Sequence, residues 1–329
     1  MARKTASLPS TVSSHEPHAL TVRRPSFLRR LLQQWDLQLM LLPALATLLL
    51  FSYAPMWGIS LSFMDYSIYK GLGDAPWVGF KHFSMLFHAI EFPRVMANTI
   101  ALSLLKFAFG FPVPILLAVM LNEVRSNAFK RTVQTITYMP NFISWVVAAG
   151  FVFTLLSRDG LINALLVSLH ILEQPVDFML QPQYFWPVLI LTGIWKGAGF
   201  GAIIYLAAIS NIDPSLYEAA DIDGAGRFRK IFAITLPSIQ GVVVILLILS
   251  IGNILNAGFD DIFLLTNNMR NYSLTDVANT IDIYVFREGI MNRRYSYGTA
   301  AGLFKGVANA ILLTTANFVA GRLGRSTLW

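Results

Sequence analysis

The chain has 329 residues, of which 55% are hydrophobic and only 13% are charged. A soluble fold of this length cannot bury so much apolar surface, so composition alone argues against a soluble enzyme. The net charge of +7 would suggest a nucleic-acid partner, but the basic residues follow the pattern of a membrane protein. Cysteine is absent, and the five histidines lack zinc-ligand spacing, so no disulfide or metal site is expected.

Six apolar stretches are each long enough to cross a bilayer, which takes about 20 residues of helix. They cover residues 37–63, 95–121, 133–156, 185–209, 238–256 and 298–321. The expected fold is therefore an all-α integral membrane protein with six transmembrane helices in one domain, 37–321. Residues 1–36 form an N-terminal tail, in which Phe27 to Trp35 has the pattern of a short interfacial helix, and residues 322–329 form a C-terminal tail.

Lysine and arginine are distributed unevenly between alternate loops. Segments 1–36, 122–132, 210–237 and 322–329 hold 14 of them in 83 residues, whereas loops 64–94, 157–184 and 257–297 hold 8 in 100 residues. Because cytoplasmic loops carry the excess of positive residues, both termini are expected in the cytoplasm. The 41-residue loop 257–297 is then external, and the aromatic residues among its charges indicate an ordered docking surface.

The proposed spans contain no Asp or Glu, and the chain has no GxxxxGK[ST] motif. Ion-coupled carriers commonly need carboxylates in the membrane, which disfavours a proton- or sodium-coupled symporter but leaves it as the alternative. Without a phosphate-binding loop the chain cannot hydrolyse nucleotide by that means, so energy for active transport must come from another subunit. A membrane enzyme is disfavoured because no paired acids or Ser-His arrangement share a membrane depth, and no catalytic residue is expected.

Three lysines, Lys106, Lys196 and Lys305, lie within spans, where an unpaired charge is costly. Each either extends its ammonium toward the membrane surface, pairs with backbone carbonyls or faces a polar transport pathway. Aromatic rings stack on sugar rings, and amides and lysines hydrogen-bond hydroxyls and carboxylates, so a carbohydrate path is one interpretation. Its candidate residues are Trp195, Lys196, Tyr205, Asn253, Asn256, Lys305 and Asn309, with both asparagine and lysine-asparagine pairs at near-helical spacing.

Glycines recur every fourth residue in two spans, at Gly193, Gly197 and Gly201 and again at Gly298, Gly302 and Gly306. Such stripes allow helices to approach closely. They predict tight contacts within the bundle or with a second membrane subunit.

The cytoplasmic loop between the fourth and fifth spans predicts a short, rigid helix. Asp213 is a good N-cap, and Pro214 suits the first helical position. The helix should run to about Asp223, where Gly224 or Gly226 can supply the left-handed residue that ends it. Such a helix offers a low surface to the groove of another protein.

This loop, residues 211–237, resembles the EAA loop of ABC importer membrane subunits. The matching positions are Glu218, Ala219, Ala220, Gly224, Ile234, Leu236 and Pro237. Segments 77–87, 121–127, 138–145 and 203–220 are similar to the carbohydrate-uptake branch of that family. The stretch from 281 to 329 resembles its LplB-like oligosaccharide and polysaccharide permeases, and the whole resemblance covers about residue 36 to the end.

The resemblance implies a type I importer permease in the bacterial inner membrane. Its partners would be a second, homologous permease subunit, two ATPase subunits, a periplasmic or lipid-anchored sugar-binding protein and membrane lipid, with no nucleic acid. The chain itself would bind no cofactor, since ATP and Mg belong to the ATPases. The first four matching residues, Glu218 to Gly224, would contact an ATPase, and the last three would set the return to the membrane. An acidic polymer such as alginate is a candidate substrate, although the lysines discriminate poorly between neutral and acidic sugars.

Overall fold

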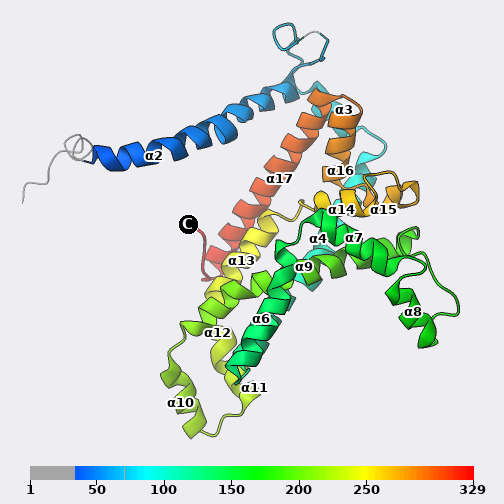
Figure 1. The fold of residues 1–329 in the computed structure, drawn as a ribbon. Helices are drawn as coiled ribbons and strands as arrows, with labels where there is room; N and C mark the ends of the chain where they lie inside the picture. Colours follow the sequence, from blue (N-terminus) through cyan, green and yellow to red (C-terminus); the bar gives the residue numbers. More distant parts are fainter. Residues whose placement is uncertain (1–33, 70) are drawn as a thin grey trace, which may run out of the picture. The chain divides into compact units, whose positions relative to one another are not determined.

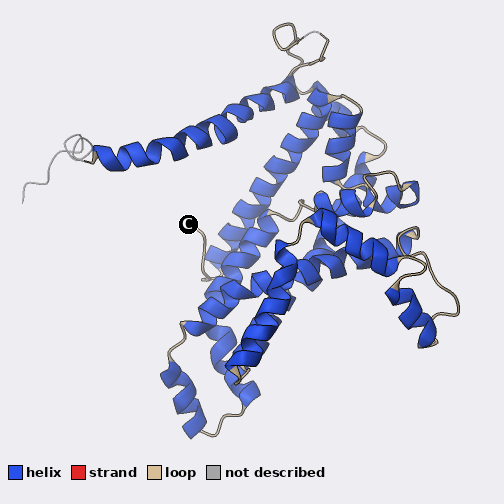
Figure 2. Ribbon diagram, in the orientation of Figure 1, coloured by secondary structure: helices blue, strands red, loops and turns tan. Residues whose placement is uncertain are grey.

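The computed structural model describes residues 34–69 and 71–329, so nearly all of the expected interfacial helix at 27–35 lies outside the described residues. Every regular element within these ranges is a helix, and the only strand-like pairing there is one isolated bridge between Met64 and Trp77 (Figure 2). The all-α fold is thus confirmed. The chain divides into two units that meet between Trp57 and Gly58, and each is described by itself.

The N-terminal unit is an apolar helical rod. It comprises α2 (Trp35–Leu48), a π-helical turn (Leu49–Tyr53) and the start of a 3-10 helix (Ala54–Phe63). All of its described residues are exposed within this chain. A helix that is apolar on every side needs lipid or protein around it, which agrees with a first membrane span.

The second unit contains the remaining helices, and the colours of Figure 1 follow their order in the sequence. They are α3 (Lys81–Phe87), α4 (Phe92–Gly110), α5 (Pro112–Asn122), α6 (Asn127–Phe142), α7 (Trp145–Leu156), α8 (Leu161–Ser168), α9 (Pro182–Ser210), α10 (Pro214–Ile222), α11 (Arg227–Lys230), η3 (Ile231–Thr235), α12 (Leu236–Ser238), α13 (Gln240–Gly252), α14 (Asp260–Leu265), η4 (Tyr272–Leu274), α15 (Thr275–Ala278), α16 (Ile281–Phe286), η5 (Arg287–Met291) and α17 (Tyr295–Arg322). Within this unit α10 lies at one end, and α3 and α16 lie at the opposite end (Figure 1).

Five helical stretches of the described chain are long and apolar enough to cross a membrane, and a bent pair brings the number to six. These five stretches are Trp35–Phe63, Phe92–Asn122, Trp145–Ser168, Pro182–Ser210 and Tyr295–Arg322. The bent pair joins Arg227–Ser238 to Gln240–Gly252 at an angle of 60°. The number of six spans agrees with the sequence prediction. Two of the predicted spans, 133–156 and 238–256, differ from the helices of the structure.

The expected continuous helix at 133–156 is wrong, because the chain breaks between α6 and α7. Ile143 and Ser144 are extended, and the Ser144 hydroxyl accepts a hydrogen bond from the Val147 amide at 3.3 Å. A serine that caps a new helix in this way ends the previous one. The apolar stretch long enough to span therefore begins at Trp145 and includes the turn between α7 and α8.

The expected fifth span at 238–256 is shorter than predicted. Its helix α13 has 13 residues, which reach about 20 Å at 1.5 Å per residue, less than the hydrocarbon thickness. Asn253 ends the helix, and Asn256 lies in the turn that follows, where its amide donates to the Asn253 carbonyl at 2.9 Å. The two asparagines are therefore neighbours through a turn and not along a helix face.

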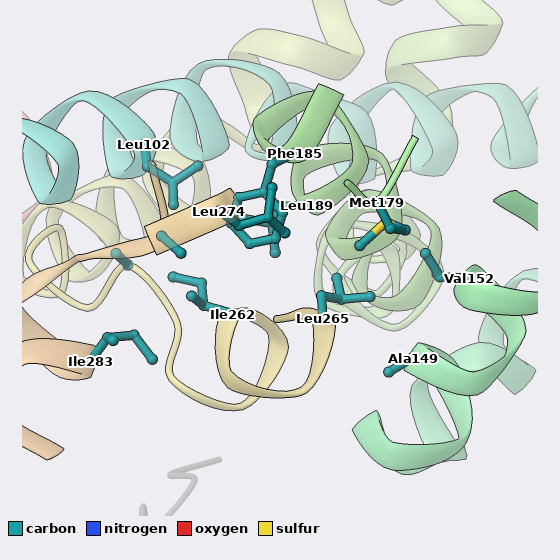
Figure 3. Packing of buried hydrophobic residues seen from close by; sticks show 12 residues of the cluster. Leu102, Ala149, Val152, Met179, Phe185, Leu189, Ile262, Leu265, Leu274 and Ile283 are labelled. Carbon is teal, nitrogen blue, oxygen red and sulfur yellow. The ribbon is translucent and has the colours of Figure 1, made fainter. Parts of the chain in front are cut away.

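The largest buried cluster shows that loop 257–297 is ordered. Ile262, Leu265 and Leu274 from this loop are fully buried against Leu102 of α4 and Phe185 of α9. Figure 3 shows these side chains converging between the helices. Packing of fully buried large aliphatic side chains stabilises the loop by roughly 1.5–3 kcal/mol for each residue, so the loop is held rigidly over the ends of the spans.

The glycine stripes serve the bundle only in part. A β-carbon at Gly201 would lie 3.2 Å from Pro114, and one at Gly298 would overlap the backbone of Gly289. At Gly193, Gly197 and Gly306, an added β-carbon would meet no neighbouring atom of the described chain within 4 Å. The first two glycines thus permit close helix contacts, whereas the other three leave room for lipid or a second subunit.

Candidate functional site: a polar cavity and a capped cytoplasmic helix

The short helix predicted between the fourth and fifth spans is present as α10, with the predicted caps, and we call it the coupling helix after the role that its resemblance to the EAA loop implies. The Asp213 carboxylate accepts a hydrogen bond from the Ser215 amide at 2.9 Å, and Pro214 is the first residue of α10. Backbone and side-chain hydrogen bonds from Ser215 hold the pKa of Asp213 below its usual value, because they favour the charged form. Gly224 has a φ of +73° and ends the segment, as expected of a left-handed cap.

Three side-chain contacts brace the loop around α10. Tyr217 and Thr235 share a hydrogen bond of 2.9 Å between their hydroxyl oxygens. The Lys230 ammonium lies 2.6 Å from the Asp221 carboxylate, and the Arg227 guanidinium lies 3.0 Å from Glu123, the C-cap residue of α5. Two of the contacts thus tie α10 to the returning chain, and the third ties that chain, through Arg227 of α11, to the end of α5.

The coupling helix presents an apolar surface that nothing in the described chain covers. Ile222 is 87% exposed, and Leu216, Glu218 and Ala219 are also exposed. Exposed apolar side chains beside a charged loop are typical of a surface that contacts another protein. The last matching residues, Ile234, Leu236 and Pro237, lie on the π-helical turn and short helix that lead back to the membrane.

A cavity of about 530 Å³ lies between α4, α5, α9 and the end of α13. It gathers three of the predicted path residues, Tyr205, Asn253 and Asn256. Its other polar lining residues are Ser103, Lys106 and Ser250, and its apolar lining includes Phe107, Phe111, Ile204, Leu246 and Leu249. Aromatic and aliphatic faces with a few convergent polar groups suit a sugar ring and its hydroxyls.

The asparagine pair is linked by side-chain hydrogen bonds. Asn253 donates its amide to the Leu249 carbonyl at 3.0 Å, and Asn256 donates to the Asn253 side-chain oxygen at 2.9 Å. This chain of hydrogen bonds fixes both amides at the cavity wall, where the backbone has left the helix. Irregular backbone at membrane depth is tolerated where it lines a water-filled cavity, which supports this use of the space.

The other four predicted path residues lie away from this cavity. Trp195 lines a separate apolar groove with Phe151 and Leu155. Lys196 is buried beneath the break between α6 and α7, Lys305 is paired with Asp282, and the Asn309 side chain accepts a hydrogen bond from the Leu255 amide at 3.2 Å. Their contact with sugar stays a prediction, and their observed partners indicate structural roles.

Lys106 is the cavity residue that the path prediction missed. Its ammonium donates to the Ala257 carbonyl at 2.6 Å and lies 2.5 Å from the Asp261 carboxylate. The sequence shows a lysine within a span, but its partner lies 155 residues later. The spacing of Ser103 and Lys106 on one helix face was the available local signal.

A cavity with several polar groups between membrane-crossing helices, together with an exposed, capped helix, is what a membrane subunit of a transporter is expected to have. Residues 110–328 match the family described as "Binding-protein-dependent transport system inner membrane component". The chain belongs to this family. It is therefore a multi-pass protein of the inner membrane and a permease subunit of an ABC importer, with a transport role and no enzymatic one.

Similar proteins support the same assignment over nearly the whole chain. The polygalacturonan/rhamnogalacturonan transport system permease protein YteP of Bacillus subtilis (strain 168) is 45% identical over 308 residues, covering 93% of this chain and 94% of that protein. Protein LplB of the same organism is 42% identical over 294 residues, covering 89% and 91%. A chain in the crystal structure of a bacterial alginate ABC transporter in complex with an alginate pentasaccharide-bound periplasmic protein is 40% identical, with a TM-score of 0.82 and coverage of 92% and 100%. No finding supports the symporter alternative.

Proposed function

We propose that this subunit imports an acidic oligosaccharide or polysaccharide. The observation that carries the proposal is the cavity, which combines a lysine, two amides and a tyrosine with apolar walls between the spans. The names of its relatives point to polymers rich in uronic acid: one is a polygalacturonan/rhamnogalacturonan permease, and another belongs to an importer of the acidic polysaccharide alginate. A cationic group in the path suits such a cargo.

The complete importer would contain a second, homologous permease, two ATPase subunits and a solute-binding protein that delivers the sugar. ATP and Mg would bind to the ATPases, and this chain would bind neither. Both termini would be cytoplasmic, and the ordered loop 257–297 would meet the binding protein outside. The coupling helix α10 would carry the motion of an ATPase to the spans, because it is exposed and its Asp221 pairs with Lys230 of α11, the helix whose Arg227 pairs with Glu123 at the end of α5.

Transport requires that the cavity hold the sugar weakly in at least one state. A ligand shifts a conformational equilibrium only through its different affinity for the two states. Outward access would admit the sugar from the binding protein, and closure of the ATPase pair would be transmitted through the coupling helices. Hydrolysis of ATP would then reset the path toward the cytoplasm.

Uptake by the assembled importer in proteoliposomes tests the proposed substrate. Trigalacturonate delivered by the binding protein should enter only with ATP, and maltotriose should not compete with it. Entry driven by a proton gradient without ATP would contradict the transport mechanism. Efficient entry of maltotriose with no entry of the acidic sugar would contradict the substrate.

The external position of loop 257–297 can be tested in this cysteine-free chain. Tyr272 is 85% exposed, so a cysteine placed there, or at the exposed Asn292, should react with a membrane-impermeant thiol reagent from outside. A cysteine at Phe228, which is 74% exposed beside the coupling helix, is the matched control and should react only after the inner membrane is permeabilised. The reverse pattern would overturn the orientation.

Replacing Asn256 with leucine should impair transport more than basal ATP hydrolysis. The change removes the hydrogen bond to Asn253 and a polar group from the cavity, while the coupling helix is untouched. Loss of one or two sugar hydrogen bonds of about 1 kcal/mol each predicts a five- to thirtyfold lower uptake rate, normalised to membrane abundance. Unchanged uptake would place the sugar path elsewhere, on the opposite face of the bundle or in the partner subunit.

A further inference from the structure

Lys106, which lines the cavity, forms an ion pair with Asp261. The Lys106 side chain on α4 is 22% exposed, and its partner Asp261, in the first turn of α14, is only 7% exposed. Asp261 is itself fixed, because its other carboxylate oxygen accepts a hydrogen bond from the Ile262 amide at 3.0 Å. The turn before it is shaped around the pair: Gly258 has a φ of +101°, and a β-carbon there would lie 2.9 Å from the lysine ammonium and overlap the carboxylate.

The lysine keeps capacity for a ligand. An ammonium has three donor hydrogens, and Lys106 uses them for two partners in the described chain, Asp261 and the Ala257 carbonyl. Its side chain lines the cavity, and one donor hydrogen remains beyond these two partners. A cation held in place at a cavity wall is suited to an anionic group of the cargo.

Ser103 provides an independent sign of a ligand at the same place. It lies three residues before Lys106, which puts both on one face of α4, and both line the cavity. Ser103 is 6% exposed, and its hydroxyl has no hydrogen-bond partner among the described residues. An unsatisfied buried hydroxyl costs free energy, so a polar ligand that reaches it gains a hydrogen bond that no side chain of the described fold supplies.

We propose that Lys106 and Ser103 bind the carboxylate of a uronate unit as the sugar crosses the membrane. Asp261 is the resident counterion: it neutralises Lys106 between transport events, because an unpaired lysine at this depth is costly. It also repels the carboxylate of the cargo and so keeps binding weak. Conduction through a membrane site requires binding that is favourable enough for entry and weak enough for exit. This inference rests on the acidic substrate proposed above.

The proposal predicts opposite effects for the two partners of the ion pair. Lys106→Met removes the cation and should weaken binding of trigalacturonate about tenfold, as loss of one charge-assisted hydrogen bond predicts. Asp261→Asn leaves the cation and removes the repulsion, so binding should tighten severalfold. If the pair served only to hold α14 against α4, both changes would alter the binding of trigalacturonate in the same direction.

Equilibrium binding of radiolabelled sugar to the assembled importer in nanodiscs, without the binding protein, is the measurement. Fully methyl-esterified trigalacturonate is the matched ligand, because it keeps the sugar rings and lacks the charges; its affinity should change little in either variant. Ser103→Ala should weaken only the acidic sugar, by a few-fold, and Lys106→Arg should retain most of its binding. Arg158→Gln, which removes an exposed cation in the turn between α7 and α8, is the control and should change neither.

The outcomes separate this site from the proposed substrate. Wild-type binding of the ester alone would contradict the acidic substrate. Wild-type preference for the acidic sugar that persists in Lys106→Met and Ser103→Ala would overturn the carboxylate site and leave the substrate standing. If Asp261→Asn does not assemble, the Lys106 and Ser103 variants decide the matter, since Ser103→Ala removes no charge and no hydrogen bond of the described fold.

Discussion

Glu218→Lys and Gly224→Asp should each lower sugar-stimulated ATP hydrolysis about tenfold or more, a loss that corresponds to only about 1.4 kcal/mol of coupling free energy. Glu218 is exposed on α10 and would meet a basic residue of the ATPase, so reversal of its charge replaces attraction by repulsion. The spans should insert normally, because neither residue contacts the core. Stimulated hydrolysis by the purified complex, compared with its basal rate, measures the effect.

The Gly224 effect depends on backbone conformation, and the loop contains its own control. Gly224 has a φ of +73°, and a β-carbon there would meet nothing within 4 Å, so the expected cost is the left-handed backbone itself, about 1 kcal/mol or more. Gly226 has a φ of −68° and equally open surroundings. Gly224→Ala should therefore impair coupling, whereas Gly226→Ala should not. Equal coupling in both alanine variants would show that the left-handed cap does not position the helix.

The structure of the coupling loop was predictable because it depends on residues that act on their near neighbours in the sequence. Asp213, Pro214 and Gly224 each act on residues within one turn, and the caps formed where the sequence placed them. The helix break at residues 143–144 was missed although its signal is also local. Ser144 is an N-cap of the same kind, but it lies inside an apolar stretch whose continuity suggested a single span.

The cavity was only partly predictable, because its members come from separate spans. Tyr205, Asn253 and Asn256 were found as polar or aromatic residues at membrane depth, and they do line one cavity. The Lys106–Asp261 pair was missed, since the acid lies in the loop beyond the fifth span and reaches back toward α4. Hydropathy assigns such an acid to water, whereas the fold pairs it with a lysine of the cavity wall.

Lys196 illustrates the choice that sequence alone left open between a structural lysine and a path lysine. Its ammonium donates to the carbonyls of Pro140, Asn141 and Ile143 at 3.3, 3.0 and 2.6 Å. The Asn141 and Ile143 carbonyls lie at and just beyond the end of α6, where helix carbonyls lack intrahelical donors, whereas the Pro140 carbonyl also accepts from the Ile143 amide at 3.2 Å. The ammonium also lies 5.5 Å from the centre of the Trp145 ring, at the start of α7. One side chain thus joins the two halves of the broken stretch.

Lys196→Met should therefore reduce stability and not substrate preference. The change leaves the Asn141 and Ile143 carbonyls without the lysine donor, and at about 1 kcal/mol or more for each, the total loss is about 2 kcal/mol. We expect a lower yield of folded protein in the membrane and a lower melting temperature of the detergent-solubilised complex. The ratio of acidic to methyl-esterified sugar bound by the protein that does assemble should equal the wild-type ratio.

Asn256→Leu is the matched comparison, because it alters a cavity residue and should reduce uptake at normal abundance. Wild-type abundance of Lys196→Met together with a lost preference for the acidic sugar would instead make Lys196 a path residue, and the capping of α6 would then be incidental to its role.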